Sequence, residues 1–494
     1  MIGSRHYDVV VIGGGTAGSV VAGRLAERGD RDVLLLEAGP DHGRYDPAGW
    51  PSDLLDASTL PLSHDWGYFG PAADGRSLSL DRARVIGGCS THNGCSQSRG
   101  WAGDYDSWER QGLAGWSAAD LKPLFDAASE RMRIRRYTDD EVQPFQRSFV
   151  DACSASGIPQ RADLDDLDGG VGVDVSPVNI VEGTRWNAAF GYLDPVRESA
   201  KLTILGGAKV RRVLIDLGRA VGVEVIIDGQ HMTIGCDQVV LSAGVYGTPE
   251  LLMRSGIGAA DELGALGIEP LLDLPGVGSN LHDHPSVNLE FNATDLLVRQ
   301  LDDFRATQGW LPEEQALAKV ASRLCDGPYD LHLYPWVEPR DDSPTGWAVV
   351  MPVSLVTPRS RGRLALRSDG ARAVPDHGYL SQVDDRVALA DGLRFAEELC
   401  ASANLAPLLG ERLNPQADDE DLDHWMRRTH SHYWHPAGTA AMGSAQSGGV
   451  CDADGKVRGV AGLRIADASL FPQIPRSTPA LPVVVVGERI VAAM

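Results

Sequence analysis

Long apolar stretches and positive charge are both scarce in this sequence. No run of about 18 apolar residues, the length that a membrane-spanning helix needs, occurs in the 494 residues. Lys and Arg number 45 against 68 Asp and Glu, and no basic stripe offsets the net charge of −23. Such a chain repels nucleic-acid phosphates and anionic membrane surfaces. We therefore expect no nucleic-acid partner and no membrane partner.

The N-terminus and the cysteines lack the patterns of exported proteins. The opening residues, MIGSRHYDVVVIGGG, lead directly into a buried-strand pattern without a charged segment, an apolar segment or a cleavage site. The seven cysteines are scattered, odd in number and free of C-x-x-C pairs. This usage fits a reducing compartment, so we expect a cytoplasmic protein.

A complete set of metal ligands is also missing. His282, His284, His430 and His432 suggest a metal at first sight, but no carboxylate or cysteine spacing completes a ligand set around them. We therefore expect no metal.

The composition is that of a soluble globular protein with a large core. Hydrophobic residues make up 43% of the chain and charged residues 23%, which are ordinary values. At 494 residues the chain is too long for one compact core. We expect two domains, which can be interleaved along the chain.

The N-terminal segment carries a dinucleotide-binding pattern. YDVVVIGGGTAGSVVAGRL is an apolar run, then Gly13-x-Gly15-x-x-Gly18, then a helical stretch, and the next apolar run ends at Glu37. This order predicts a βαβ half of a doubly wound sheet. Gly13 permits the tight turn, Gly15 lets backbone N–H groups approach a pyrophosphate, and Gly18 lets helix and strand pack. Glu37 is placed to accept hydrogen bonds from a ribose.

The C-terminal segment supplies a second set of candidate residues. SHYWHPAGTAAMG places His435 between Trp434 and Pro436, and VAGLRIADAS reads as a strand with Asp467 at its tip. Because ligands bind outside the carboxyl ends of the strands in doubly wound sheets, Asp467 can reach the same cofactor as Gly15. The first and last segments are therefore expected to share one domain.

Between these segments the pattern is less specific. Residues 40–82, rich in Pro, Gly and Asp, predict an extended excursion over the surface or the cofactor. The remaining expectations are helices around Trp101, Trp108 and Trp116, strands at 201–216 and 220–229, a strand, turn and helix at 237–258, and a structural helix at 417–432.

Taken together, these motifs resemble the glucose-methanol-choline (GMC) flavoprotein oxidoreductases. The resemblance runs from the glycine motif through DWGY, ARVIGGCSTHN, SAGVYGTPELLMRSGIG, LPGVGSNLHDHP and PRSRGRLAL to WHPAGTAAMG, GLRIADAS and GER, in the family's order. It implies FAD and oxidation of an alcohol to a carbonyl. It also implies a doubly wound, Rossmann-like FAD-binding domain (1–150, 200–292 and 432–494) interleaved with an α+β substrate domain (151–199 and 293–431) on an antiparallel or mixed sheet.

His92 stands at a distinctive position in this pattern. In GGCSTHN it precedes Asn93, where most members carry an apolar residue, whereas the choline oxidase branch has a histidine covalently joined to the flavin 8α-methyl. The similarity implies the same bond here. The alternative is a histidine that only packs or hydrogen-bonds near the dimethylbenzene ring.

The resemblance also implies a base for the reaction. An alcohol gives up a hydride readily only when its hydroxyl proton leaves before or with it, so a base must stand within hydrogen-bond reach. The family's HP-x-GT motif places this role on His435, with His430 and His432 as alternatives. A second His or Asn usually lies nine positions before the GER-type triplet, and here that position is Thr478. A threonine can donate one neutral hydrogen bond but cannot act as a histidine base.

A larger set of residues is implied to contact FAD, through the glycine loop, the GG segment and the ends of later strands. These are Gly13, Gly15, Thr16, Ala17, Gly18, Glu37, Ala38, Trp66, Arg84, Gly88, Cys89, His92, Asn93, Gly94, Ser96, Val210, Ala243, Trp434, Asp467, Ala468 and Pro479.

Two other functions stay open at this point. The first is a hydroxynitrile lyase of the same fold with a structural FAD, and the second is a nicotinamide dehydrogenase that uses the glycine loop alone. Within alcohol oxidation, the electron acceptor is O₂ or another acceptor, and the alcohol ranges from small primary or amino alcohols to aryl alcohols and sugars. The chain is expected to be a monomer or a homodimer. The span between His284 and PYDLHLYPWVEP is short for this family, which usually builds its substrate lid from that region, so we expect a more open substrate site.

Overall fold

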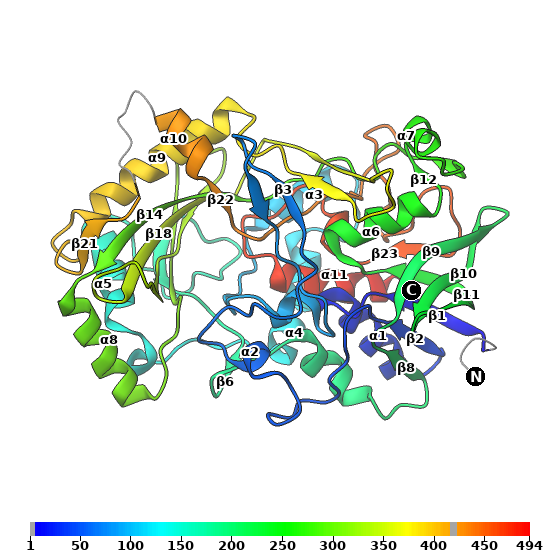
Figure 1. The fold of residues 1–494 in the computed structure, drawn as a ribbon, viewed down its shortest axis with the longest axis horizontal. Helices are drawn as coiled ribbons and strands as arrows, with labels where there is room; N and C mark the ends of the chain where they lie inside the picture. Colours follow the sequence, from blue (N-terminus) through cyan, green and yellow to red (C-terminus); the bar gives the residue numbers. More distant parts are fainter. Residues whose placement is uncertain (1–4, 415–421) are drawn as a thin grey trace.

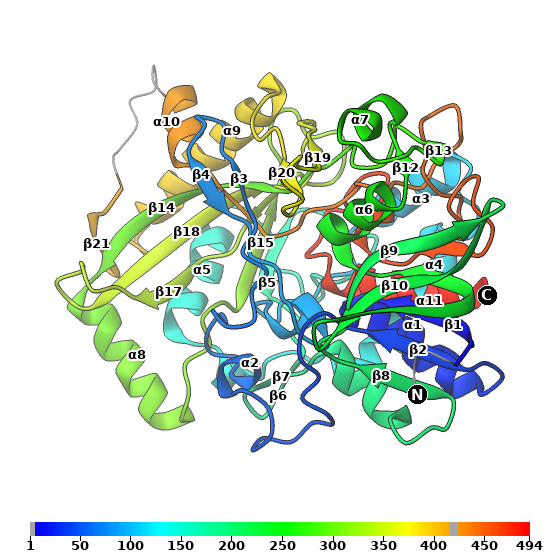
Figure 2. The same ribbon diagram turned by 45° about the vertical axis from the view of Figure 1, so that its right-hand side comes forward.

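Two large β-sheets lie side by side, each with its own helices, in the computed structural model, which describes residues 5–414 and 422–494 (Figure 1). The first sheet takes strands from both ends of the chain, so that the blue and red segments meet on one side of the molecule (Figures 1 and 2). The second sheet comes mainly from the middle of the chain. The expected architecture, a doubly wound domain interleaved with an α+β domain, is confirmed.

The first sheet has seven strands in the order β8-β2-β1-β11-β10-β9, with β23 beside β11. β1 pairs in parallel with both β2 and β11, whereas β9 and β10 form an antiparallel extension. β1 and β2 are almost wholly buried, as expected for central parallel strands covered on both faces. The strands are β1 (Tyr7–Ile12), β2 (Val33–Leu36), β8 (Leu202–Leu205), β9 (Lys209–Asp216), β10 (Arg219–Ile227), β11 (Gln230–Leu241) and β23 (Leu463–Ile465).

The first and last long helices pack against each other beside this sheet. α1 (Thr16–Arg28) begins directly after the glycine loop, and α11 (Ala480–Ala492) closes the chain. Gly487 permits their close approach, because a Cβ there would overlap the Val20 side chain. α4 (Ala118–Arg131) packs on the same helix, α11.

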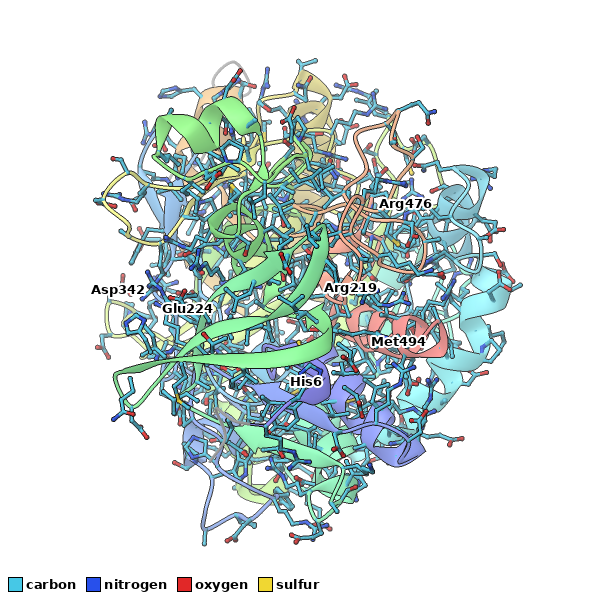
Figure 3. The ribbon with its side chains drawn as sticks, turned by 90° about the vertical axis from the view of Figure 1, so that its right-hand side faces the viewer. His6, Arg219, Glu224, Asp342, Arg476 and Met494 are labelled. Carbon is cyan, nitrogen blue, oxygen red and sulfur yellow. The ribbon has the colours of Figure 1, made fainter. Side chains whose placement is uncertain are left out.

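Both ends of the described chain lie at the first sheet. His6 Nε2 lies 2.8 Å from Asp237 Oδ1, and Arg31 donates to the carbonyl oxygen of Met494 at 2.7 Å. Figure 3 shows His6 and Met494 on the same side of the molecule. The N- and C-terminal segments therefore form one structural unit.

The second sheet has eight strands in the order β21-β14-β18-β16-β15-β5, with β17 beside β18 and β22 beside β14. All of its pairs are antiparallel. α9 (Val383–Cys400) packs on β14, β16 and β18. The strands are β5 (Gly172–Val175), β14 (Pro285–Ala293), β15 (Ala316–Val320), β16 (Leu331–Leu333), β17 (Trp336–Pro339), β18 (Trp347–Leu355), β21 (Leu409–Arg412) and β22 (Ser431–His432).

The domain boundaries at 292 and 432 stay a prediction. β14 joins the second sheet from Pro285 onward, and Ser431–His432 pairs with its beginning. Both expected boundaries therefore coincide with strands of the second sheet.

Residues 40–82 run as the extended excursion expected from their composition, and their only regular elements are a short helix and a hairpin. Trp108 lies within α3, whereas Trp101 and Trp116 stand just outside the helices that follow them. Of the expected helix at 417–432, the structure describes α10 (Leu422–Thr429), and its acidic start lies outside the described residues. The expected end is wrong, because Ser431–His432 pairs with β14 as strand β22.

The remaining helices and strands lie in the connections. They are α2 (Ser52–Leu55), β3 (Phe69–Pro71), β4 (Ser77–Ser79), α3 (Ala102–Arg110), α5 (Pro144–Ala155), β6 (Ile180–Val181), β7 (Thr184–Arg185), α6 (Gly244–Arg254), β12 (Ile257–Gly258), α7 (Ala260–Ala265), β13 (Leu272–Asp273), α8 (Asp295–Gln308), β19 (Arg363–Ala365) and β20 (Val374–Asp376). Among the described helices, none has the length and apolar character to cross a membrane.

Candidate active site

One cavity of about 630 Å³ brings the predicted site residues together. Its walls include His435, Thr478 and all of the residues expected to contact FAD except Gly18 and Arg84. The lining runs from the glycine loop of the first sheet to Tyr334 and Trp336 of the second. Residues from both ends of the sequence thus face one space.

The glycine loop forms a cradle at one end of the cavity. Gly13 has a φ of +96°, and a Cβ at Gly18 would overlap the Gly13 carbonyl oxygen, so turn and packing both require glycine. At Gly15 the nearest atom to a Cβ would be Gly88 Cα at 3.8 Å. A side chain at Gly15 would therefore meet whatever occupies the cavity rather than the protein. This arrangement fits a pyrophosphate at the start of α1.

Glu37 and Asp467 lie at the ends of β2 and β23 and are both buried. Glu37 accepts N–H bonds from Gly14 at 2.8 Å and Gly39 at 2.7 Å, and burial raises its pKa to about 7. Asp467 accepts a bond from the Gly244 N–H at 2.9 Å, and burial raises its pKa as well. Both carboxylates fix backbone around the cavity and also face it.

Arg84 lies outside the cavity lining, although the resemblance implied contact with FAD. Its guanidinium stands 5.1 Å from the ring centre of Trp66 and donates to the Ala38 carbonyl oxygen at 3.1 Å. Arg372 stands 5.3 Å from the same ring. Arg84 therefore supports two residues that line the cavity, Trp66 and Ala38.

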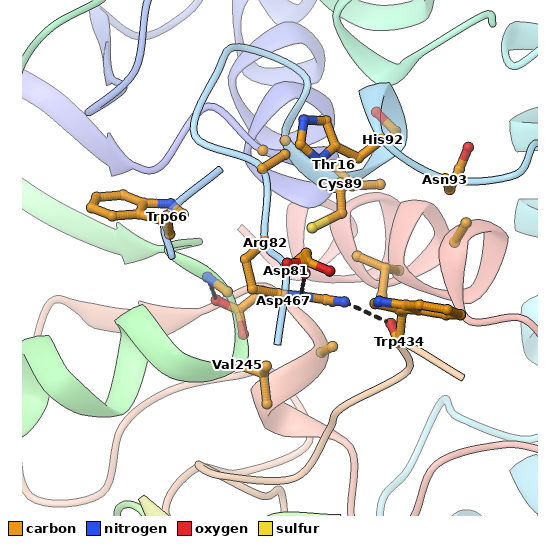
Figure 4. A pocket seen from close by; sticks show the side chains of 18 of the residues that line it. Thr16, Trp66, Asp81, Arg82, Cys89, His92, Asn93, Val245, Trp434 and Asp467 are labelled. Atoms are coloured by element: carbon orange, nitrogen blue, oxygen red, sulfur yellow. Dashed lines mark hydrogen bonds between the residues drawn. The ribbon is translucent and has the colours of Figure 1, made fainter. Parts of the chain in front are cut away.

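His92 follows a short 3₁₀ turn (Gly88–Thr91) and faces the cavity beside Cys89 (Figure 4). Its Nε2 is buried and has no hydrogen-bond partner among the described residues. Burial lowers the pKa of His92 to about 4. The side chain is therefore a neutral imidazole with a free nitrogen, which is the state that a bond to a flavin methyl carbon requires. The glycine loop and the free Nε2 of His92 are both features that suit a bound FAD, so the residues present fit this cofactor.

The segment carrying His435 is held by two charged side chains that no motif predicted. The His435 N–H donates to Asp283 Oδ1 at 2.8 Å, and Arg82 donates to the Trp434 carbonyl oxygen at 3.0 Å (Figure 4). Trp434 has a φ of +57°, a conformation that costs free energy in a non-glycine residue. Tyr379 donates to the other oxygen of Asp283 at 2.9 Å. These bonds fix the direction of the His435 side chain.

The imidazole of His435 pairs with a second histidine. Its Nδ1 lies 3.0 Å from Nδ1 of His284, and no described residue bonds its Nε2. Burial lowers the pKa of His435 well below its ordinary value, and the neighbouring His284 and His332 lower it further. His435 is therefore a neutral imidazole.

The other candidates from the sequence are placed differently. His430 Nε2 accepts the Ala73 N–H at 2.9 Å, and His432 Nε2 lies 2.8 Å from the Ser79 carbonyl oxygen; neither lines the cavity. Thr478 does line it, and its hydroxyl donates to the Ser96 carbonyl oxygen at 3.2 Å. In residues 5–414 and 422–494, no group of three or more His, Cys, Asp or Glu side chains is arranged to hold a metal ion.

Several residues that line the cavity were missed by sequence reasoning. These residues belong to none of the family motifs. Two adjacent acids just ahead of a buried strand were the one pattern in the sequence that could have indicated them. The missed lining residues include Arg82, Glu313, Glu314, Tyr334, Trp336 and Tyr433.

Comparison with known proteins supports the same assignment. The family model described as GMC oxidoreductase matches residues 7–286 with its N-terminal part and 358–487 with its C-terminal part. Choline oxidase from Arthrobacter globiformis is 33% identical, covering 99% of this chain and 94% of that protein. Mitochondrial choline dehydrogenase from Mus musculus is 32% identical, covering 99% and 89%. The crystal structure of pyridoxine 4-oxidase from Mesorbium loti is 28% identical with a TM-score of 0.86, covering 98% of each chain.

The chain belongs to the GMC oxidoreductases. It is an FAD-dependent oxidoreductase that acts on CH–OH donors, as the resemblance to this family implied. Because the cofactor is FAD, the alternative of a nicotinamide dehydrogenase is excluded.

Proposed function

We propose that this enzyme oxidises an alcohol to a carbonyl by hydride transfer, with His435 as the general base. The observation that carries this proposal is the neutral His435 in the cavity, oriented by His284 and Asp283. When bound, FAD supplies the hydride acceptor, flavin N5. His435 receives the hydroxyl proton, and the developing alkoxide then expels its hydride more easily.

The base function requires one tautomer of His435. A lone pair must be present on Nε2, because Nδ1 is directed at His284. Nδ1 of His435 then carries the hydrogen and donates it to Nδ1 of His284. After proton transfer, this bond stabilises the imidazolium in the same geometry.

Thr478 has a smaller role in this proposal. Its hydroxyl hydrogen is engaged with the Ser96 carbonyl oxygen, so it donates to an alkoxide only by giving up that bond. A neutral hydrogen bond contributes about 0.5–1.5 kcal/mol, far less than a positioned base. Thr478 therefore assists the orientation of the substrate oxygen.

His92 is the proposed attachment point of FAD. Its Nε2 is buried, unpartnered and neutral, and it faces the cavity on the segment that ends at Gly94. A covalent link at this position would raise the flavin potential and favour hydride acceptance.

Anaerobic stopped-flow reduction tests the function. Wild-type holoenzyme is mixed with a panel of primary, amino, aryl and sugar alcohols, and the flavin absorbance is followed. We expect bleaching by at least one alcohol and reoxidation after mixing with O₂ or an artificial acceptor. Cyanohydrin cleavage without bleaching by any alcohol would instead establish the lyase with a structural FAD.

A further inference from the structure

Arg82 brings a positive charge to the cavity without an acidic partner. Its side chain is half-buried and lines the cavity, and among residues 5–414 and 422–494 no carboxylate forms an ion pair with it. Nε donates to the Asp81 carbonyl oxygen, and Nη2 donates to the Trp434 carbonyl oxygen at 3.0 Å (Figure 4). Carbonyl oxygens satisfy the hydrogens of a guanidinium but do not neutralise its charge.

The acids around Arg82 form their hydrogen bonds with other groups. Burial opposes the charge of Arg82, whereas the charges of Asp283 and Asp81 act to raise its pKa, so both acids are near. Asp283 accepts the His435 N–H at 2.8 Å, and Asp81 accepts the Ser79 hydroxyl at 2.5 Å. A ligand in the cavity is therefore the group that can complete the neutralisation of Arg82.

The backbone of Arg82 is held in place on both sides. Its N–H donates to Asp65 Oδ1 at 2.7 Å, and its carbonyl oxygen accepts the Trp66 N–H at 2.9 Å. Together with the bond to the Trp434 carbonyl oxygen, these contacts fix both ends of the residue. The positive charge therefore has a defined position in the empty cavity, before any ligand binds.

This position is close to both histidines of the proposed flavin site. Burial is the main cause of the lowered pKa of His92 and of His435, and the charge of Arg82 lowers both further. In the proposed function, His92 holds the flavin ring at one end and His435 acts on the substrate beside the ring. A ring that reaches from one histidine to the other must pass near the Arg82 guanidinium.

The other positive side chains of the lining belong to a different part of the cavity. Arg372 stands 5.3 Å from the ring centre of Trp66, and Arg254 forms an ion pair with Glu250 at 2.9 Å. Burial lowers the pKa of Lys209, and Arg211 and Arg372 lower it further, so these cations lie near one another. Arg82 is thus separate from this group, which comprises Lys209, Arg211, Arg254 and Arg372.

We propose that the Arg82 guanidinium is the counter-charge of the reduced flavin, an inference that rests on the proposed hydride transfer. Transfer of a hydride, which carries two electrons and one proton, places one negative charge on a neutral flavin ring, while the hydroxyl proton goes to His435. A fixed positive group stabilises that negative charge more than it stabilises the neutral oxidised ring. Arg82 therefore raises the reduction potential of the flavin and favours acceptance of the hydride.

The reduction potential of the holoenzyme tests this role without any alcohol. The flavin is reduced chemically under anaerobic conditions in equilibrium with a reference dye. R82Q, which removes the charge but keeps an N–H donor, should lower the equilibrium constant for reduction roughly 10–100-fold, about 30–60 mV for a two-electron couple. R82K keeps the charge and should stay closer to wild type. A wild-type potential in R82Q would overturn the inference and leave alcohol oxidation intact, whereas wild-type flavin that no alcohol bleaches would overturn only the proposed function.

Arg76 provides the matched control. Its side chain also donates to carbonyl oxygens of the C-terminal segment, Nε to Arg428 at 2.9 Å and Nη2 to His430, but it does not line the cavity. R76Q should therefore keep the wild-type potential, and an equal shift in R76Q would contradict a specific role of Arg82. FAD content and thermal midpoint are measured for every variant to verify folding.

Restoring the charge from solution separates the charge of Arg82 from its contacts. In R82A, added guanidinium chloride should move the potential back toward the wild-type value, whereas sodium chloride at the same concentration should not. Equal effects of the two salts would contradict the proposal. Loss of FAD from both R82A and R82Q would mean that Arg82 binds the oxidised cofactor, and this result would also overturn the proposal.

Discussion

Nδ1 of His284 lies 3.0 Å from Nδ1 of His435, and the two rings meet nearly edge to face at 86°. One nitrogen must donate and the other accept, so the tautomers of the two residues are coupled. Burial lowers the pKa of His284 to about 3 and that of His435 well below its ordinary value, and both rings are therefore neutral near pH 7. His284 thus determines which nitrogen of His435 is free to act as a base.

Removing the proposed base should slow flavin reduction far more than removing its helper. H435A is expected to lose about 10²–10⁴-fold in the anaerobic reduction rate while keeping FAD, because a positioned general base contributes that much. T478V removes one neutral hydrogen bond and should cost about tenfold or less. Stopped-flow absorbance gives both rates.

A rise in pH supplies the control for this pair. Because more of the alcohol is then ionised in solution, the rate of H435A should partly recover at high pH, whereas that of T478V should not. Equal losses in the two variants, or a larger loss in T478V, would mean that the base is misassigned.

Replacement of His284 should impair the reaction through the tautomer of His435. H284A leaves Nδ1 of His435 without its partner, and an unsatisfied buried group costs about 1–3 kcal/mol, so reduction should slow about 10–100-fold. H284N retains a hydrogen-bonding side chain and should recover part of the rate.

The substrate dissociation constant distinguishes this effect from general disruption. It should stay near the wild-type value in both variants, because His284 acts through His435 rather than on substrate. Equal rates for H284A and H284N would contradict control of the tautomer.

The flavin bond proposed for His92 has a direct readout. Acid-precipitated and washed wild-type protein should stay yellow, whereas H92A should release its FAD on the same treatment. H92A that retains FAD before precipitation should also be reduced more slowly, because the covalent link raises the flavin potential. A white wild-type pellet would refute the bond.

A branched side chain at Gly15 should abolish FAD binding while sparing the fold. A Cβ there would meet no protein atom closer than Gly88 Cα at 3.8 Å, so G15V fills cavity space where the backbone must approach the pyrophosphate. Purified G15V should lack flavin absorbance and keep a wild-type far-UV spectrum. Gly264 in α7 has no atom within 4 Å of its Cβ position, and G264V should bind FAD normally. If G15V bound a full complement of FAD, the assignment of the glycine loop to the FAD-binding site would be wrong.

Contiguous motifs predicted the parts of this enzyme that a few neighbouring residues define. Gly13, Gly15 and Gly18 between a strand and a helix predict a dinucleotide-binding turn, because backbone geometry and the helix N-terminus act locally. The positions of His92 and His435 in the family motifs likewise follow from the linear sequence. These motifs indicated the fold, the cofactor and the reaction class.

Only the tertiary structure decided which other side chains meet them. His284 was noticed in the sequence only as a metal candidate, and Glu314 was not noticed at all, because no pattern in the chain indicates that His284 contacts His435 or that Glu314 lines the cavity. His430 and His432 are close to His435 in the sequence and were therefore candidates for the base. In the structure, both side chains form hydrogen bonds with backbone atoms of residues 72–79. The substrate wall is built by antiparallel strands whose neighbours are set by long-range pairing, and each strand directs alternate side chains to opposite faces. A shift of one residue in that register would exchange the groups that face the cavity, which is why the sequence determined the reaction class and only the packed sheet decided which side chains line the cavity.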